Sequence, residues 1–322
     1  MKNALVFLAK LTVSAALIWF VLSRLSLDEI VEGLENPRWG WLLAALAVYG
    51  VSAFGGALQW SWLLGRAGIR APATEIRRLY FIGLFFNNFL PANIGGDAWK
   101  IVDLGRQQKR HLGVFCATLL DRIIGLMALS LVGSLVLVAA SGLDIPLPRH
   151  ALLLPVLLVA LVAGLAFLLS RRLRRLLPAV ARGLRLEGVA LRLEKLVGEL
   201  GRYRSHVRWL NGLVAFSVGV QILRLATHLL VARGLGYDLS LIQNVQLLVL
   251  IPLLAVVLML PVTINGIGLR ESVSASLLTW AGLAAPHAVG MELAAYLVQV
   301  VFSLQGGVLL WLGRGRPREG NS

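Results

Sequence analysis

The sequence is short of several residue types on which common protein functions depend. It has a single cysteine, Cys116, so it cannot form an internal disulfide framework or a cluster of thiolate metal ligands. It also lacks a Cys/His metal motif, a phosphate-binding Walker loop and a convincing Ser/His/Asp set. We therefore expect no enzymatic activity, no cofactor and no bound metal.

Charged residues are scarce, and acidic residues are fewer than basic ones. Asp, Glu, Lys and Arg make up 15% of the chain, whereas soluble domains carry about a quarter. The 31 basic residues outnumber the 16 acidic ones and give a formal net charge of +15. These cations stand mainly in short blocks between apolar runs, which is the positive-inside pattern of an inner membrane protein. We interpret them as a topology signal that attracts anionic lipid headgroups, and not as a nucleic-acid-binding surface.

Long apolar runs dominate the chain, because 58% of its residues are hydrophobic. A helix needs about 20 apolar residues to cross the hydrocarbon core of a bilayer. Such runs cover residues 4–22, 40–64, 112–140, 151–170, 210–232, 241–260, 265–283 and 289–312. The sequence thus predicts an all-α fold, a polytopic integral membrane helical bundle of about eight spans in one domain over residues 1–322. The basic blocks place both termini in the cytoplasm of a bacterial cell.

A further apolar segment, residues 79–99, is interrupted in its middle. The interruption consists of polar, proline and glycine residues, namely Asn87, Asn88, Pro91, Gly95, Gly96 and Asp97. Cations flank the segment on both sides, with Lys100 on the later side, so we expect a re-entrant hairpin that enters and leaves on the cytoplasmic face. A transmembrane helix with a proline kink is the alternative. In the hairpin, the glycines would permit a sharp turn with positive φ, and Asp97 would cap the helix that follows.

A second stretch, from Leu260 to Glu271, repeats this order of residues. Both stretches contain Leu-Pro, two variable residues, an isoleucine, a glycine-rich turn and a charge; here the turn and the charges are Gly266, Gly268, Arg270 and Glu271. The second stretch either joins two full spans or forms a deep hairpin. If both stretches are hairpins, they enter from opposite faces and their tips meet near the midplane, which is the layout of an inverted repeat.

The most basic part of the chain, residues 171–208, separates the two halves. Within it Leu176, Leu177, Val180 and Leu184 recur at helical spacing among arginines. This pattern is typical of an amphipathic helix lying on the inner leaflet. A solvated linker with no further role is the alternative.

Charged residues inside apolar segments are costly in a membrane and indicate function. Here they are Asp121, Arg122, Arg224, His228, Arg270, Glu271 and Glu292. Asp121 and Arg122 are neighbours that point about 100° apart on a helix, so they need not pair with each other, whereas Arg224 and His228 share a face. Salt bridges that hold helices together are the alternative to a binding role for these charges.

The cations and the glycine-broken helices together predict an anion site. Free backbone N–H groups at a helix start attract anions, and arginine recognises phosphate in a bidentate manner. The predicted ligand is an anionic headgroup. The candidate substrate-binding residues are Asn87, Asn88, Pro91, Gly95, Gly96, Asp97, Asp121, Arg122, Arg224, Gly266, Gly268, Arg270 and Glu271.

These motifs resemble those of the integral-membrane, flippase-like domain family of lysylphosphatidylglycerol synthase. The resemblance rests on residues 87–91 with Gly95, Gly96 and Asp97, on residues 121–125, and on Leu260-Pro261 with Gly266, Gly268, Arg270 and Glu271. It implies a lipid translocator, because in the bifunctional multiple peptide resistance factor this domain moves aminoacylated phosphatidylglycerol to the outer leaflet. The separate soluble domain that makes the lipid there has no counterpart in this sequence.

Three functions remain open from the sequence. The first is a flippase for an anionic phospholipid or a polyprenyl-phosphate-linked lipid in the inner membrane. The second is an enzyme or accessory membrane subunit of glycolipid or glycosyl transfer that uses Asp97 or Glu271. The third is a scaffold that recruits partners through residues 171–208. The expected partners are anionic lipid headgroups, with a lipid-synthesising or glycosyltransferase partner and a homo-oligomer as further alternatives, and no nucleic acid.

Overall fold

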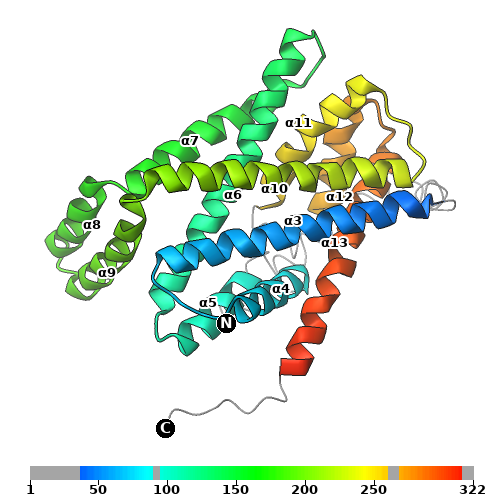
Figure 1. The fold of residues 1–322 in the computed structure, drawn as a ribbon. Coiled ribbons are helices and arrows are strands. Elements are labelled where there is room, and N and C mark those ends of the chain that lie inside the picture. Colours follow the sequence, from blue (N-terminus) through cyan, green and yellow to red (C-terminus); the bar gives the residue numbers. More distant parts are fainter. Residues whose placement is uncertain (1–36, 90–94, 260–267, 314–322) are drawn as a thin grey trace.

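The computed structural model of the chain describes residues 37–89, 95–259 and 268–313 (Figure 1). Within these ranges the chain is all-helical, with eleven α-helices and no strand. Six of the described helices are long and apolar enough to cross a membrane, as predicted for a polytopic membrane protein. The predicted span over residues 4–22 lies outside the described residues.

The first half of the bundle consists of a long helix, a helical hairpin and a second long helix. These elements are α3 (Trp39–Arg66), the hairpin of α4 (Ala73–Phe89) and α5 (Gly95–Gln107), and α6 (His111–Gly142). The open end of the hairpin is held together by polar contacts. Nε2 of Gln107 donates to Oε1 of Glu75 at 3.3 Å, and Nη1 of Arg110 donates to the Gly68 carbonyl at 3.2 Å. The chain therefore returns to the end at which it entered, as predicted for a hairpin, with arms longer than residues 79–99. Its re-entry on the cytoplasmic face of the membrane stays a prediction.

The second half repeats this order in the opposite direction. Its elements are α10 (Val207–Gly234), the hairpin of α11 (Leu241–Leu258) and α12 (Leu269–Leu277), the short η3 (Leu278–Ala281), and α13 (Ala285–Gly313). Nε2 of Gln243 donates to the Ala281 carbonyl at 3.0 Å and closes this hairpin at its open end. The 9 residues of α12 reach about 14 Å, half of a hydrocarbon core. Although α11 alone is long enough to cross, the short α12 favours the hairpin over two full spans for this stretch.

The two halves meet along α3 and α10, which lie side by side (Figure 1). Trp62 and Phe216 pack edge to face, with ring centroids 4.8 Å apart. At Gly55 an added Cβ would come within 2.8 Å of Val220, so a small residue is needed there for the helices to approach. The hairpins then lie on either side of this central pair.

Three helices connect the halves. They are α7 (Leu153–Leu168), which follows the short η2 (Arg149–Leu152), and the pair α8 (Arg171–Gly183) and α9 (Glu187–Arg204). The pair corresponds to the basic stretch 171–208 and projects from one end of the bundle (Figure 1). The Leu176, Val180 and Leu184 side chains are exposed, so the apolar stripe of α8 is not covered by the described part of the protein.

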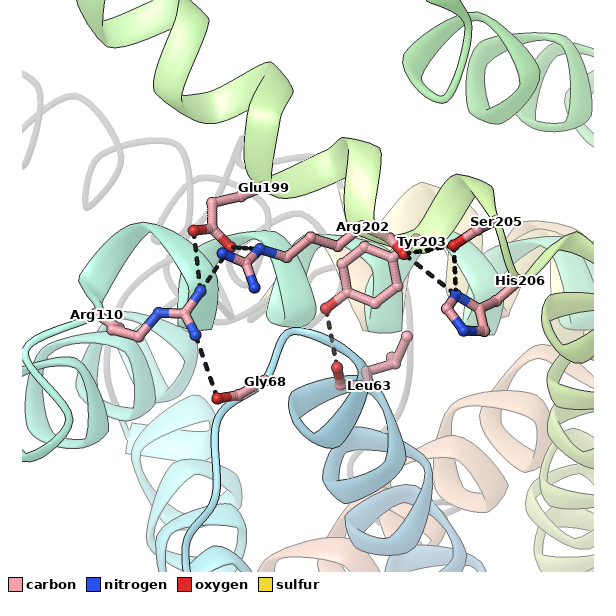
Figure 2. A network of polar contacts seen from close by, with 8 residues as sticks. All are labelled: Leu63, Gly68, Arg110, Glu199, Arg202, Tyr203, Ser205 and His206. Atoms are coloured by element: carbon pink, nitrogen blue, oxygen red, sulfur yellow. Dashed lines mark hydrogen bonds and ion pairs between the residues drawn. The ribbon is translucent and has the colours of Figure 1, made fainter.

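Polar contacts fix α9 to the bundle, as Figure 2 shows. Glu199 accepts from Arg110 at 2.9 Å and pairs with Arg202 at 3.0 Å. The Tyr203 hydroxyl donates to the Leu63 carbonyl at 2.9 Å, and burial raises the pKa of Tyr203, so this donor stays protonated. The second half of the basic stretch is thus a docked helix and not a loose linker.

The first hairpin is closed by unusually tight packing at Gly96. A Cβ added there would lie 1.8 Å from the carbonyl oxygen of Gly83 on the facing helix. The described glycines with positive φ are Gly68, Gly236, Gly268 and Gly282, so the expected strained turn at Gly96 is wrong. The glycine is required because two backbones touch, whereas at Gly268, with φ 81°, the expected turn is confirmed.

The packing at Gly96 predicts a severe effect of Gly96→Ala. Because the obstacle is the Gly83 backbone, which cannot rotate away, the two arms must separate, and we expect a destabilisation above about 3 kcal/mol. Gly219→Ala is the matched control, since a Cβ there meets nothing within 4 Å and alanine favours helix. Thermal unfolding in detergent measures both variants. Equal melting temperatures for the two would contradict the close packing.

The opposed hairpins predict a labelling pattern in a Cys116→Ala background. Cysteines at Arg78 and Gln107, at the open end of the first hairpin, should react with a membrane-impermeant thiol reagent from the same side. Cysteines at Asp238 and Thr279, at the open end of the second, should react from the other side. Labelling of Arg78 and Gln107 from different sides would eliminate the first hairpin.

Candidate functional site

A cavity of about 370 Å³ lies where the two hairpins approach each other. Its wall includes residues of both hairpins and of the long helices α3, α6, α10 and α13. Beside it, the Tyr296 hydroxyl of α13 donates to the Asn88 carbonyl at the end of α4 at 3.3 Å and ties the first hairpin to the second half. Residues of both hairpins therefore line one cavity, while the hairpin tips lie outside the described residues.

The first charged cluster of the wall is centred on Asp97 of α5. Its carboxylate is bound by Nζ of Lys100 at 2.8 Å and by Arg122 of α6. The Lys100 ammonium lies 4.9 Å from the ring centroid of Trp60 and 5.0 Å from that of Tyr80, within cation–π range. With 4% of its surface exposed, Lys100 is part of the cavity wall. The interpretation of Lys100 as a flanking charge was wrong.

The second charged cluster is centred on Glu292 of α13, whose exposed fraction is 2%. Its Oε1 accepts from Nη1 of Arg270 at 2.5 Å, and its Oε2 lies 3.4 Å from Nε2 of His228. The Arg270 guanidinium also lies 4.4 Å from the ring centroid of Tyr296. The alternative prediction for the membrane charges, ion pairs between helices, is thus confirmed for Arg122 and Arg270.

The two clusters follow one plan. In each half, the second arm of the hairpin is ion-paired to the long helix that comes after it, through Asp97–Arg122 and Arg270–Glu292. In each half, the long helix that comes before also provides a side chain to an acid of the later helix. In the second half this contact is His228–Glu292, and in the first half Nε2 of Gln59 donates to Oδ1 of Asp121 at 2.8 Å. As expected from their positions on the helix, Asp121 and Arg122 have different partners.

Arg224 of α10 differs from the other cations of the cavity. Among the described residues, no carboxylate lies within 4 Å of its guanidinium, whereas Lys100, Arg122 and Arg270 each have one. Space for it is provided by Gly56 of α3, where an added Cβ would lie 2.1 Å from the Tyr80 hydroxyl and 3.5 Å from Nη2 of Arg224. Arg224 and His228 both face the cavity, which confirms their predicted shared face.

At the helix start of each hairpin, one backbone N–H group is already bonded to a side chain. The Gly96 N–H donates to Oδ1 of Asn87 at 2.9 Å, and the Gly268 N–H donates to Oε2 of Glu271 at 2.7 Å. These two N–H groups are therefore taken by side chains of the hairpins themselves. Asp97 is held by two cations, whereas the residue before α5, to which a cap at this position would bind, lies outside the described residues.

The structure brings most of the predicted site residues together. Those that line the cavity are Asn87, Asn88, Asp97, Asp121, Arg122, Arg224 and Arg270. Gly95 and Gly96 begin α5, and Gly268 and Glu271 form the start of α12. Pro91 and Gly266 lie outside the described residues.

Sequence reasoning did not include several cavity residues in the site. They are Gln59, Tyr80, Lys100, His228, Glu292 and Tyr296. For Lys100 a signal existed, since an aspartate three residues earlier on a helix is placed to pair with it. No group of His, Cys, Asp and Glu in the described ranges is arranged to hold a metal ion.

Comparisons with known proteins agree with this architecture. No curated protein and no solved structure matches the chain. A family model, the lysylphosphatidylglycerol synthase TM region, matches residues 7–307, which is nearly the whole chain. The chain, with its multi-pass helical bundle and paired hairpins, belongs to the lysylphosphatidylglycerol synthase TM region family.

Proposed function

We propose that this protein translocates an anionic lipid, either a phospholipid or a polyprenyl-phosphate-linked lipid, across the bacterial inner membrane. The observation that carries the proposal is the Arg224 guanidinium, which faces a cavity inside the bundle with no carboxylate of the described residues within 4 Å. An arginine at such a depth needs a negative partner. A phosphate in the cavity would supply it.

The other charges favour an anion at Arg224 over other ligands. Lys100 and Arg122 are compensated by Asp97, and Arg270 is compensated by Glu292. Counted over the whole cavity, Lys100, Arg122, Arg224 and Arg270 outnumber Asp97, Asp121 and Glu292 by one positive charge. A guanidinium also offers a planar pair of donors that matches phosphate oxygens.

Translocation is supported by the arrangement of the hairpins around this cavity. They enter the bundle from opposite ends, so each lies between the cavity and one membrane face. Movement of one hairpin or half relative to the other would open the cavity to one face at a time, which is how inverted-repeat transporters work. The family assignment is in keeping with this role.

The alternative, an enzyme or accessory subunit of glycosyl transfer, receives less support from the contacts of its proposed carboxylates. Asp97 is bound by two cations, and Glu271 caps the Gly268 N–H. In these positions both carboxylates already have structural partners, which compete with a role as acid or base. The transport assay below also separates the two functions, because an accessory subunit alone would move no lipid.

For the orientation, we place the α8–α9 pair and both termini on the cytoplasmic side, because basic segments stay there. The exposed leucines of α8 and the surrounding arginines suit the surface of an anionic leaflet. In this orientation the first hairpin enters from the cytoplasm and the second from the opposite face.

The proposal predicts that Arg224 is required for transport. Protein in liposomes of phosphatidylcholine and phosphatidylglycerol should move fluorescent phosphatidylglycerol between leaflets, as measured by dithionite quenching. Arg224→Gln should slow this movement roughly tenfold to a hundredfold, the effect of losing one charged hydrogen-bond donor. Arg224→Lys should recover part of the rate, because an ammonium keeps the charge without the planar fork.

Arg208→Gln is the matched control for this experiment. Arg208 lies on the same helix, is exposed and does not line the cavity. It should transport at the wild-type rate. A folded Arg224→Gln variant that transports as fast as Arg208→Gln would remove Arg224 from the site, and wild-type protein that moves no lipid would contradict the proposed function.

A further inference from the structure

Asp121 is the carboxylate of the cavity wall that has no cation bound to it. Its Oδ1 accepts from the neutral Gln59 amide at 2.8 Å, and no basic nitrogen of the described residues lies within 4 Å of it. Asp97 and Glu292, by contrast, each contact two basic side chains. A carboxylate at this depth that lacks a direct counter-ion is costly to keep ionised, and protonation removes that cost.

Among the described residues, the negative charge of Asp121 is compensated only by cations that do not contact it directly. The charged and titratable groups that face it belong to α3, α4, α5, α6 and α10, with the second cluster across the cavity; they are Tyr49, Tyr80, Asp97, Lys100, Arg122, Arg224, His228, Arg270 and Glu292. The positive charges of Lys100 and Arg224 stabilise the ionised form of Asp121, whereas the negative charge of Asp97 destabilises it. Because Asp97 itself engages Lys100, Arg224 is the cation whose charge is not already shared with a bound acid.

An anion bound at Arg224 would remove the part of this support that Arg224 provides. It would neutralise the guanidinium and add a negative charge to the cavity that Asp121 also lines. Two anions close together in a cavity of low dielectric repel strongly. Addition of a proton to the carboxylate removes this repulsion. The Gln59 amide can donate to Asp121 in either state, so the structure around it need not change.

We infer that Asp121 takes up one proton when an anionic headgroup binds at Arg224, so that the lipid anion and the proton occupy the cavity together. The step converts the carboxylate and a proton from water into a carboxylic acid, and release of the lipid returns the proton. This inference rests on the proposed function and names the proton as the ion whose movement is coupled to lipid translocation. In an alternating-access cycle, the proton gradient would then drive the headgroup in the direction in which protons flow.

Linkage makes the inference measurable at equilibrium. If lipid binding takes up a proton, lowering the pH must raise the affinity for the lipid. The factor by which protonation raises lipid affinity equals the factor by which bound lipid raises proton affinity. Lipid affinity rises as the pH falls because protons are a reactant in a binding step that takes them up. One linked proton raises affinity by at most about tenfold for each unit of pH lowered, over the range in which the empty cavity leaves Asp121 ionised.

The test is calorimetric titration of purified protein with dioctanoyl phosphatidylglycerol. Titrations at about pH 6 and about pH 8 give the pH dependence, and buffers of different ionisation enthalpy at one pH give the number of protons taken up. We expect wild-type protein to take up close to one proton per lipid. Asp121→Asn should bind lipid with no proton uptake and with an affinity independent of pH, while Asp121→Glu should restore both properties.

Asp144→Asn is the matched control for the loss of a carboxylate. Asp144 lies in the exposed turn after α6 with φ 54°, a conformation that asparagine also adopts, and it does not line the cavity. It should take up protons as the wild type does.

Two outcomes would overturn the inference and leave the proposed function standing. One is lipid binding by the wild type without proton uptake, and the other is uptake that persists in Asp121→Asn. If the wild type neither binds nor moves phosphatidylglycerol, the proposed function fails for this lipid and the inference fails with it.

Discussion

Compensation of charge inside the membrane is the constraint on which the rest of this structure depends. A charged side chain in the hydrocarbon region has no water to solvate it, so the bundle must supply its partner. Asp97 and Arg270 meet this need by pairing with Arg122 and Glu292 on neighbouring helices. Breaking such a pair on one side costs about 3–5 kcal/mol, so each pair also fixes where a hairpin arm lies against its long helix.

The same constraint governs the backbone. Both hairpins end inside the bundle, where the last carbonyls and first N–H groups of a helix have no water to bond. Side chains of the hairpins and of α13 satisfy them: Asn87 binds the Gly96 N–H, Glu271 binds the Gly268 N–H, and Tyr296 binds the Asn88 carbonyl. These residues therefore form the frame of the cavity, and recognition of a ligand falls to the other side chains of its wall.

The sequence was most informative where charge and helix periodicity are local. Cations on both flanks of one broken segment were enough to predict the first hairpin. The second hairpin remained one of two alternatives, since the weakly charged loops on its side of the membrane carry no comparable topology signal. Lys100 shows the limit of that reasoning. A cation near the end of an apolar run is interpreted as a flanking charge, although Lys100 pairs with Asp97 in the cavity wall.

Contacts between distant segments could not be predicted in this way. The need for glycine at position 96 comes from the Gly83 backbone on the other arm, and a sequence pattern does not reveal which backbones touch. The distinction between Arg224 and the other membrane arginines depends equally on three-dimensional placement. Four cations and several acids were visible in the sequence, but only the assembled bundle determines which cation has no acid beside it among the described residues.

The comparison of the two halves explains why that cation matters to the whole bundle. In the second half one residue, Glu292, binds both the hairpin through Arg270 and the preceding helix through His228. In the first half these contacts are divided between neighbours, since Arg122 binds the hairpin and Asp121 binds the preceding helix through Gln59. The division leaves one acid of the first half without a local cation, and Arg224, which faces it across the cavity, belongs to the second half. Any ligand that occupies Arg224 therefore changes the electrostatic attraction between the halves, so occupancy of the cavity and the relative stability of the arrangements of the two halves are linked.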